Sequence, residues 1–197
     1  MLVGCQFSLY PMTDKFVDVI LGSVSSLDER KDLRISRDEL STLLVGSAQA
    51  IFDAVLDCFV AADRLAQGHL VLNALFSQGC PGEPDDEICR PEKSSQTVAG
   101  TGVGNTSVEP SGVEVCAQFA VLPMGDPGYM DIIYREIATV KSSSLAYRAK
   151  NFCTRIDGDA RAVFDALQHA FTSAAQDVGH VVVTATISTG SPSAKSN

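Results

Sequence analysis

Two histidines hold equivalent places in the sequence and are its first candidates for acid–base chemistry. Each follows a glycine, as Gly68-His69 and Gly179-His180, and each opens an apolar run. A histidine of ordinary pKa exchanges protons near neutral pH and can act as a general acid or base. A turn or a packing role explains the shared position equally well. A cofactor-free enzyme that uses His69 or His180 is therefore the last of three hypotheses.

The familiar catalytic motifs are missing from the sequence. It contains no nucleophile elbow, phosphate-binding loop, HExxH zinc motif or dinucleotide fingerprint. Asp85-Asp86-Glu87 lies in a polar stretch, where carboxylates are usually solvated. Asp157 and Asp159 flank a glycine at an expected helix start, and N-capping explains one of them. We therefore expect a protein that is not an enzyme and has no catalytic residue, cofactor or metal site.

Charge and cysteine content narrow the class of protein further. The net charge of −9 argues against binding to a nucleic-acid backbone, which needs clustered lysine and arginine. The six cysteines form no CxxC pattern, and only Cys80 and Cys89 lie in a loop with room to pair or to bind a metal. Free thiols indicate a reducing compartment. With no signal-peptide pattern and no run of about 18 apolar residues, we expect a cytoplasmic protein without membrane insertion.

The elements that must position any site are written twice. Residues 5–12 recur as residues 117–124, and residues 46–54 recur as residues 158–166. Matched residues stay 111 or 112 positions apart, so only single-residue insertions or deletions separate the copies. A period this long is a small domain and not a solenoid repeat.

Glycine, proline and serine dominate the stretch between the copies, which has no helical or strand periodicity. Such composition is typical of a linker. The sequence predicts a first repeat over residues 1–78, a flexible linker over 79–114, a second repeat over 115–190 and a frayed tail over 191–197.

Each copy follows the order strand, helix, strand, strand, helix, strand. In the first strand, apolar Phe7 alternates with polar Ser8 and Tyr10, so one face is buried. Ser47 and Asp159 are expected N-caps of the second helix of each copy. The first helices carry an apolar stripe at helical spacing: Phe16, Val19, Ile20 and Val24 in one copy, and Tyr129, Ile132, Ile133 and Ile137 in the other.

This order predicts an α+β fold of tandem ferredoxin-like βαββαβ repeats. Each repeat would form an antiparallel four-stranded sheet with both helices on one face. The other face would be left for a partner sheet or a ligand.

Several short strings follow the order and spacing of a known family. They include Phe7–Met12 (FSLYPM), Ser41–Ser47 (STLLVGS) and Phe76–Gly82 (FSQGCPG) in the first copy, and Gln118-Phe-Ala, Pro123-Met124, Asp157-Gly-Asp159 and Phe164 in the second. The chain resembles the YkoF family of thiamine- and hydroxymethylpyrimidine-binding proteins over nearly its whole length. This resemblance implies a homodimer that binds thiamine or its pyrimidine precursor without chemistry. It also implies a functional link to an ABC-type uptake system.

A binder of thiamine needs an apolar slot, hydrogen-bond partners for the aminopyrimidine and negative potential near the thiazolium cation. In the first copy we expect hydroxyl groups from Ser8, Tyr10 and Thr42, stacking by Phe7 or Tyr10, and Met12 at the edge of the slot. Phe7 also fits a place in the core under the helices. Thr42 also fits a purely structural role, because a hydroxyl beside a glycine turn can cap backbone groups.

The second copy offers Phe119, Met124, Thr154 and Asp157 as the corresponding candidates. Thr154 keeps the place of Thr42, and Phe119 fits the core as well as Phe7 does.

The polar residues of the first copy are only partly retained in the second. Ala120 replaces Ser8, and Leu122 replaces Tyr10. A ligand atom left without its hydrogen-bond partner costs roughly 1–3 kcal/mol. We therefore expect one site in each repeat, with tighter binding in the first. The remaining hypothesis is a regulatory or dimerisation module that senses another small heterocycle.

Overall fold

The computed structural model describes residues 3–80 and 109–193. Most of the predicted linker, Cys89 and the last residues of the predicted tail lie outside this part. The first repeat contains β1 (Val3–Pro11), α1 (Phe16–Val24), a 3-10 helix (Ser25–Glu29), β2 (Arg34–Arg37), β3 (Thr42–Gly46), α2 (Ala48–Ala66) and β4 (Leu70–Gln78). The second contains β5 (Glu114–Met124), α3 (Tyr129–Lys141), β6 (Ala146–Ala149), β7 (Thr154–Asp159), α4 (Ala160–Asp177) and β8 (His180–Thr189).

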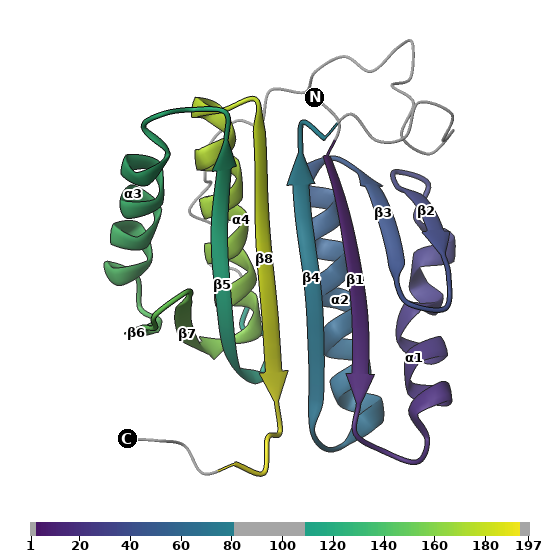
Figure 1. The fold of residues 1–197 in the computed structure, drawn as a ribbon. Coiled ribbons are helices and arrows are strands. Elements are labelled where there is room, and N and C mark those ends of the chain that lie inside the picture. Colours follow the sequence, from purple (N-terminus) through teal and green to yellow (C-terminus); the bar gives the residue numbers. More distant parts are fainter. Residues whose placement is uncertain (1–2, 81–108, 194–197) are drawn as a thin grey trace.

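The two repeats share one antiparallel sheet of eight strands, in the order β2-β3-β1-β4-β8-β5-β7-β6 (Figure 1). Each half has the strand order of the predicted ferredoxin-like repeat, which confirms the fold class. The sequence predicted two separate four-stranded sheets, whereas β4 and β8 pair with each other and join them. This pairing places two long apolar strands in the centre and leaves only the short β2 and β6 at the edges, which limits exposed edge backbone.

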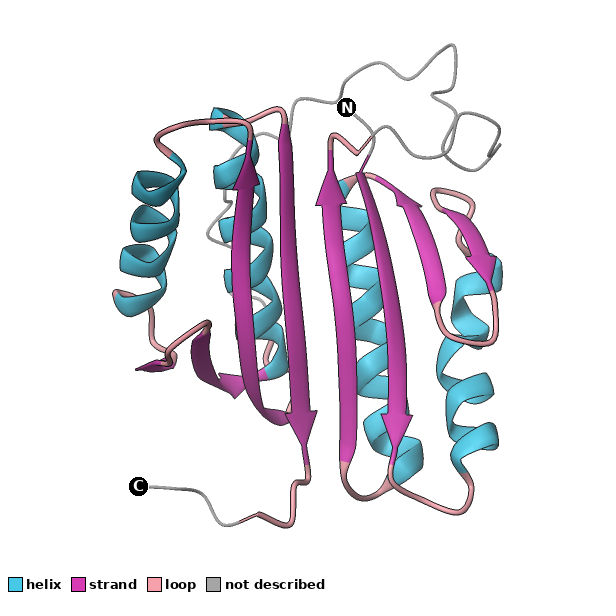
Figure 2. Cartoon of the chain, viewed as in Figure 1, coloured by secondary structure: helices cyan, strands magenta, loops and turns pink. Residues whose placement is uncertain are grey.

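The helices cover one face of this sheet, and Figure 2 shows α2 and α4 behind the long central strands. The Phe52 ring on α2 stacks on Phe76 of β4 with 4.0 Å between centroids. Phe59 of α2 lies 6.4 Å from Phe164 of α4. Aromatic rings from both repeats therefore meet in one continuous core.

Side-chain caps fix where the two long helices begin. Ser47 accepts a hydrogen bond from the backbone N–H of Ala50, and Asp159 accepts one from that of Arg161. Both N-caps match the sequence prediction, because a short oxygen-bearing side chain satisfies a free N–H in the first turn.

The first residue of each apolar stripe is not buried. Phe16 begins α1 and is 52 % exposed, and Tyr129 begins α3 and is 46 % exposed. The buried contacts come from later turns, through Val19 and Ile132.

Candidate functional site

The open face, as we call the side of the sheet opposite the helices, carries the polar half of each strand. In β1 the buried residues alternate with Gln6, Ser8 and Tyr10, which turn to the open face. The strand register places Asn73 of β4 opposite Ser8 and Leu75 opposite Gln6. Hydrogen-bonding and apolar side chains thus lie next to one another on an uncovered surface of the described chain.

The loop between β2 and β3 is held against this surface. Ser8 Oγ donates to the carbonyl oxygen of Leu40 at 2.7 Å, and Gln6 Nε2 donates to Ser41 Oγ at 3.1 Å. Asp38 Oδ1 accepts from the backbone N–H groups of Leu40 and Ser41, each at 2.8 Å. The Leu40 carbonyl oxygen therefore lies against β1, and its apolar side chain remains 78 % exposed.

Three of the predicted site residues of the first repeat are accessible to a ligand. Ser8 is partly buried on the open face, and Tyr10 is half exposed two residues further along the same face. Met12 directly follows the strand, and its exposed side chain lies at the Tyr10 end of β1.

Phe7, Phe119, Thr42 and Thr154 lie on the other face. Phe7 is paired with Thr42 in the strand register, and Phe119 is paired with Thr154. All four are buried beneath the helices. The structure therefore does not bring them together with Ser8 and Tyr10, because one strand position decides the face.

On the open face of the second repeat, the charged side chains come from β7. Met124 is partly exposed near the end of β5. Asp157 of β7 accepts from Arg155 Nε at 2.9 Å, and Arg155 Nη2 lies 3.1 Å from Cys116 Sγ. Partial burial and hydrogen bonding with Asp157 raise the pKa of the Cys116 thiol. Sequence reasoning singled out Asp157 but missed Arg155, although their spacing of two residues places both on one face of a strand.

The two histidines have different surroundings. His69 Nε2 lies 3.1 Å from Ser188 Oγ, and His180 pairs with Met124 in the strand register. Within the described residues, no group of three or more His, Cys, Asp or Glu side chains is arranged to hold a metal ion.

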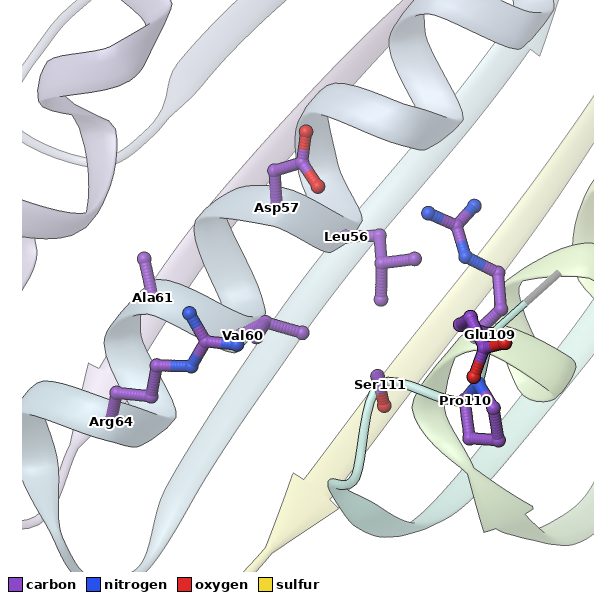
Figure 3. Close-up of a pocket in the computed structure, with 9 residues that line it drawn as sticks. Leu56, Asp57, Val60, Ala61, Arg64, Glu109, Pro110 and Ser111 are labelled. Atoms are coloured by element: carbon purple, nitrogen blue, oxygen red, sulfur yellow. The ribbon is translucent and has the colours of Figure 1, made fainter.

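A separate pocket lies on the helix-covered side, between α2 and α4 (Figure 3). Its volume is about 340 Å³. Asp57 and Arg64 come from α2, and residues 109–111 close the opposite side. Arg161 also lines the pocket and is bound to Asp53 at 3.0 Å. None of the predicted ligand residues reaches this pocket, so the open face and the pocket are independent candidates.

The family model of the "YKOF-related Family" matches residues 2–83 and 114–194 of this chain. A curated protein of Bacillus subtilis (strain 168), the "Putative HMP/thiamine-binding protein YkoF", is 33% identical over 194 residues, covering 98% of this chain and 93% of that protein. HMP denotes hydroxymethylpyrimidine.

Solved structures match about one repeat. The hypothetical protein MJ1052 of Methanocaldococcus jannascii is 20% identical with a TM-score of 0.39, and the match covers 42% of this chain and 87% of that one. A "putative thiamine biosynthesis/salvage protein" of Thermotoga maritima is 20% identical with a TM-score of 0.35, covering 38% and 81%. Among the described residues, no helix is long and apolar enough to cross a membrane.

Proposed function

The chain belongs to the YkoF-related family, and we propose that it binds thiamine or its hydroxymethylpyrimidine unit on the open face of the sheet. The named relative from Bacillus subtilis supports this ligand class, since the match extends over nearly the whole of both chains. The role is binding without chemistry.

The arrangement of Ser8, Tyr10 and Leu40 carries the proposal. Tyr10 offers an aromatic face for a flat ring and for the positive charge of a thiazolium, which ring quadrupoles attract. Ser8 and Gln6 offer hydrogen-bonding groups to the amino group and ring nitrogens of the pyrimidine. Leu40 lines the edge and would exclude water from one side of the ligand. Together they supply the apolar slot with a few polar groups that small-molecule sites need.

The second repeat would hold a weaker site. Ala120 and Leu122 stand where Ser8 and Tyr10 stand in the first repeat, so a hydroxyl and a phenol are lost. Asp157 would offer negative charge, but Arg155 already binds it. Met124 would close the slot as Met12 does in the first repeat.

The four residues on the helix-covered face would act indirectly. Phe7 of β1 and Thr42 of β3 form a buried cross-strand pair on the face of the sheet opposite to Ser8 and Tyr10. Phe119 and Thr154 form the same pair in the second repeat. Their proposed role is to fix the strands and not to touch the ligand.

We assign this binding to the cytoplasm, in uptake or salvage of the pyrimidine or the vitamin, with a functional link to an ABC-type transporter. The five described cysteines are free, which fits a reducing compartment. A homodimer is part of the proposal, because Leu75, Leu122 and Met124 expose at least 40 % of their surface on the open face. Sedimentation analysis of the full chain would detect a dimer.

Thermal unfolding of the full chain in the presence of single candidate ligands tests the proposal. A ligand that binds only the folded state raises the melting temperature, and the rise grows with the logarithm of its concentration relative to Kd. Thiamine and hydroxymethylpyrimidine should each raise it, whereas unrelated heterocycles such as adenine and nicotinamide should not. A shift with an unrelated heterocycle alone would instead favour the regulatory-module hypothesis.

A further inference from the structure

A cluster of cations lies on the open face of the second repeat. It consists of Arg148 of β6, Lys150 of the following loop and Arg155 of β7, and we call it the cationic cluster. Arg148 and Arg155 are directly opposite each other in the strand register. Lys150 Nζ lies 3.4 Å from Gln118 Oε1, and Gln118 pairs with Arg155. The three cations therefore surround one stretch of sheet around Gln118.

The first repeat has no such cluster at the equivalent positions. With the offset of 112 residues, Arg148, Lys150 and Arg155 correspond to Ser36, Asp38 and Leu43. Asp38 binds the backbone of its own loop, and Leu43 adds an apolar side chain to the open face. The second repeat has thus gained positive charge where the first has an anion, a hydroxyl and an aliphatic group.

The geometry of the cluster favours an anionic ligand. Arg148 and Arg155 occupy directly opposed positions on neighbouring strands, so one anion bound there could accept hydrogen bonds from two guanidinium groups. Asp157 already pairs with Arg155 through Nε at 2.9 Å. The Asp157 carboxylate therefore orients the Arg155 guanidinium. The cluster is cationic although the net charge of the whole chain is −9.

We propose that the cationic cluster binds a phosphomonoester, so that the second repeat selects the phosphorylated form of the ligand and the first the unphosphorylated form. A phosphomonoester carries about −1.5 to −2 charges near pH 7. Arginine matches phosphate oxygens with paired N–H groups, and lysine adds a point charge. Ala120 and Leu122 supply the apolar bed for the attached ring. The choice of ring rests on the proposed function, whereas phosphate recognition does not.

Calorimetry and ³¹P NMR with two probes test this inference on the full chain. Phenyl phosphate reports on a phosphomonoester attached to a ring other than that of thiamine, and thiamine monophosphate is compared with thiamine. Arg155→Leu and Lys150→Asp install the residues of the first repeat. Each should weaken binding of phenyl phosphate by about tenfold, the effect of losing one charge-assisted hydrogen bond. Lys31→Asp makes the same change of charge on an exposed turn of the first repeat and should leave binding unchanged.

The outcomes separate this inference from the proposed function. Binding of thiamine with no gain from its phosphate, and no effect of Lys150→Asp, would overturn the inference and leave the function intact. Phenyl phosphate binding that depends on Lys150, without any binding of thiamine, would uphold the inference and overturn the function. Equal losses in Lys150→Asp and Lys31→Asp would show only a long-range effect of net charge and would also overturn it. Lys150 is exposed in a loop, so its variant keeps the test open if Arg155→Leu does not fold.

Discussion

Gly79 lies against the carbonyl oxygen of Gly179 at one end of the strand pair that joins the repeats, so closely that a β-carbon on Gly79 would overlap it. The same contact recurs at the other end, where Gly190 meets the carbonyl oxygen of Gly68. Both Gly79 and Gly190 have a positive φ, 85° and 62°. The close approach of backbone at the junction of β4 with β8 thus explains why glycine stands at both Gly79 and Gly190.

Gly79→Ala should lower the free energy of unfolding for two separate reasons. The left-handed backbone conformation costs a non-glycine residue about 1–2 kcal/mol. Overpacking against Gly179 adds typically 1–3 kcal/mol. Gly125→Ala is the matched control, because Gly125 has the same φ of 85° but no atom within 4 Å of the added β-carbon. Urea unfolding of both variants measures the difference, and equal losses would contradict a close-packed junction.

Asp159→Ala should destabilise the chain in a pH-dependent way. Burial alone would raise the pKa of Asp159. Hydrogen bonds donated by Ser111, Arg161 and Gly112 outweigh the effect of burial, so the pKa in the folded state is lowered. A lowered pKa contributes stability above the unfolded value of about 3.9, and this contribution is lost as the pH falls through the folded pKa. We expect a cost of about 0.5–2 kcal/mol at pH 7 that shrinks below about pH 4.

Ser47→Ala is the control for this pH dependence. Ser47 is the equivalent N-cap of the first repeat and carries no charge, with its Oγ 3.2 Å from the Ala50 N–H. Its loss should cost a similar amount at every pH in the same unfolding experiment. Parallel pH profiles for the two variants would refute a charge effect at Asp159.

Local sequence signals predicted the elements of each repeat well. The N-caps Ser47 and Asp159 and the buried face of Phe7 follow from side-chain chemistry and strand alternation, which act over a few residues. The face of Thr42 was harder, because Leu44 and Val45 are both apolar and both buried. This run hides the alternation that places Thr42 on the face of Leu44.

Long-range pairing could not be predicted from the same signals. The union of β4 and β8 depends on which strands meet in space, and no local pattern in the sequence specifies the partner. One hint was present, since Val181, Val182 and Val183 form a continuous apolar run that suits a central strand better than an edge. The cationic cluster could not be predicted from the sequence either, because only the β6–β7 register places Arg148 opposite Arg155.

Tyr10→Leu should weaken the site of the first repeat and make it resemble that of the second, which carries Leu122. Loss of a ring and a phenol from a ligand contact should reduce thiamine affinity by roughly tenfold, within the range of about 1–3 kcal/mol for an unsatisfied polar group. Tyr134→Leu removes an exposed tyrosine from α3 and should not change the affinity. Calorimetry on both variants measures this, and an unchanged affinity in Tyr10→Leu would exclude Tyr10 from the site.

Isothermal titration of the full chain with thiamine tests the central claim most directly. We expect two binding events for each chain with different affinities, the tighter one lost or weakened in Tyr10→Leu. Two equal sites would contradict the assigned difference between the repeats. No heat of binding at several temperatures, with no shift of the melting temperature, would contradict the binding of thiamine itself.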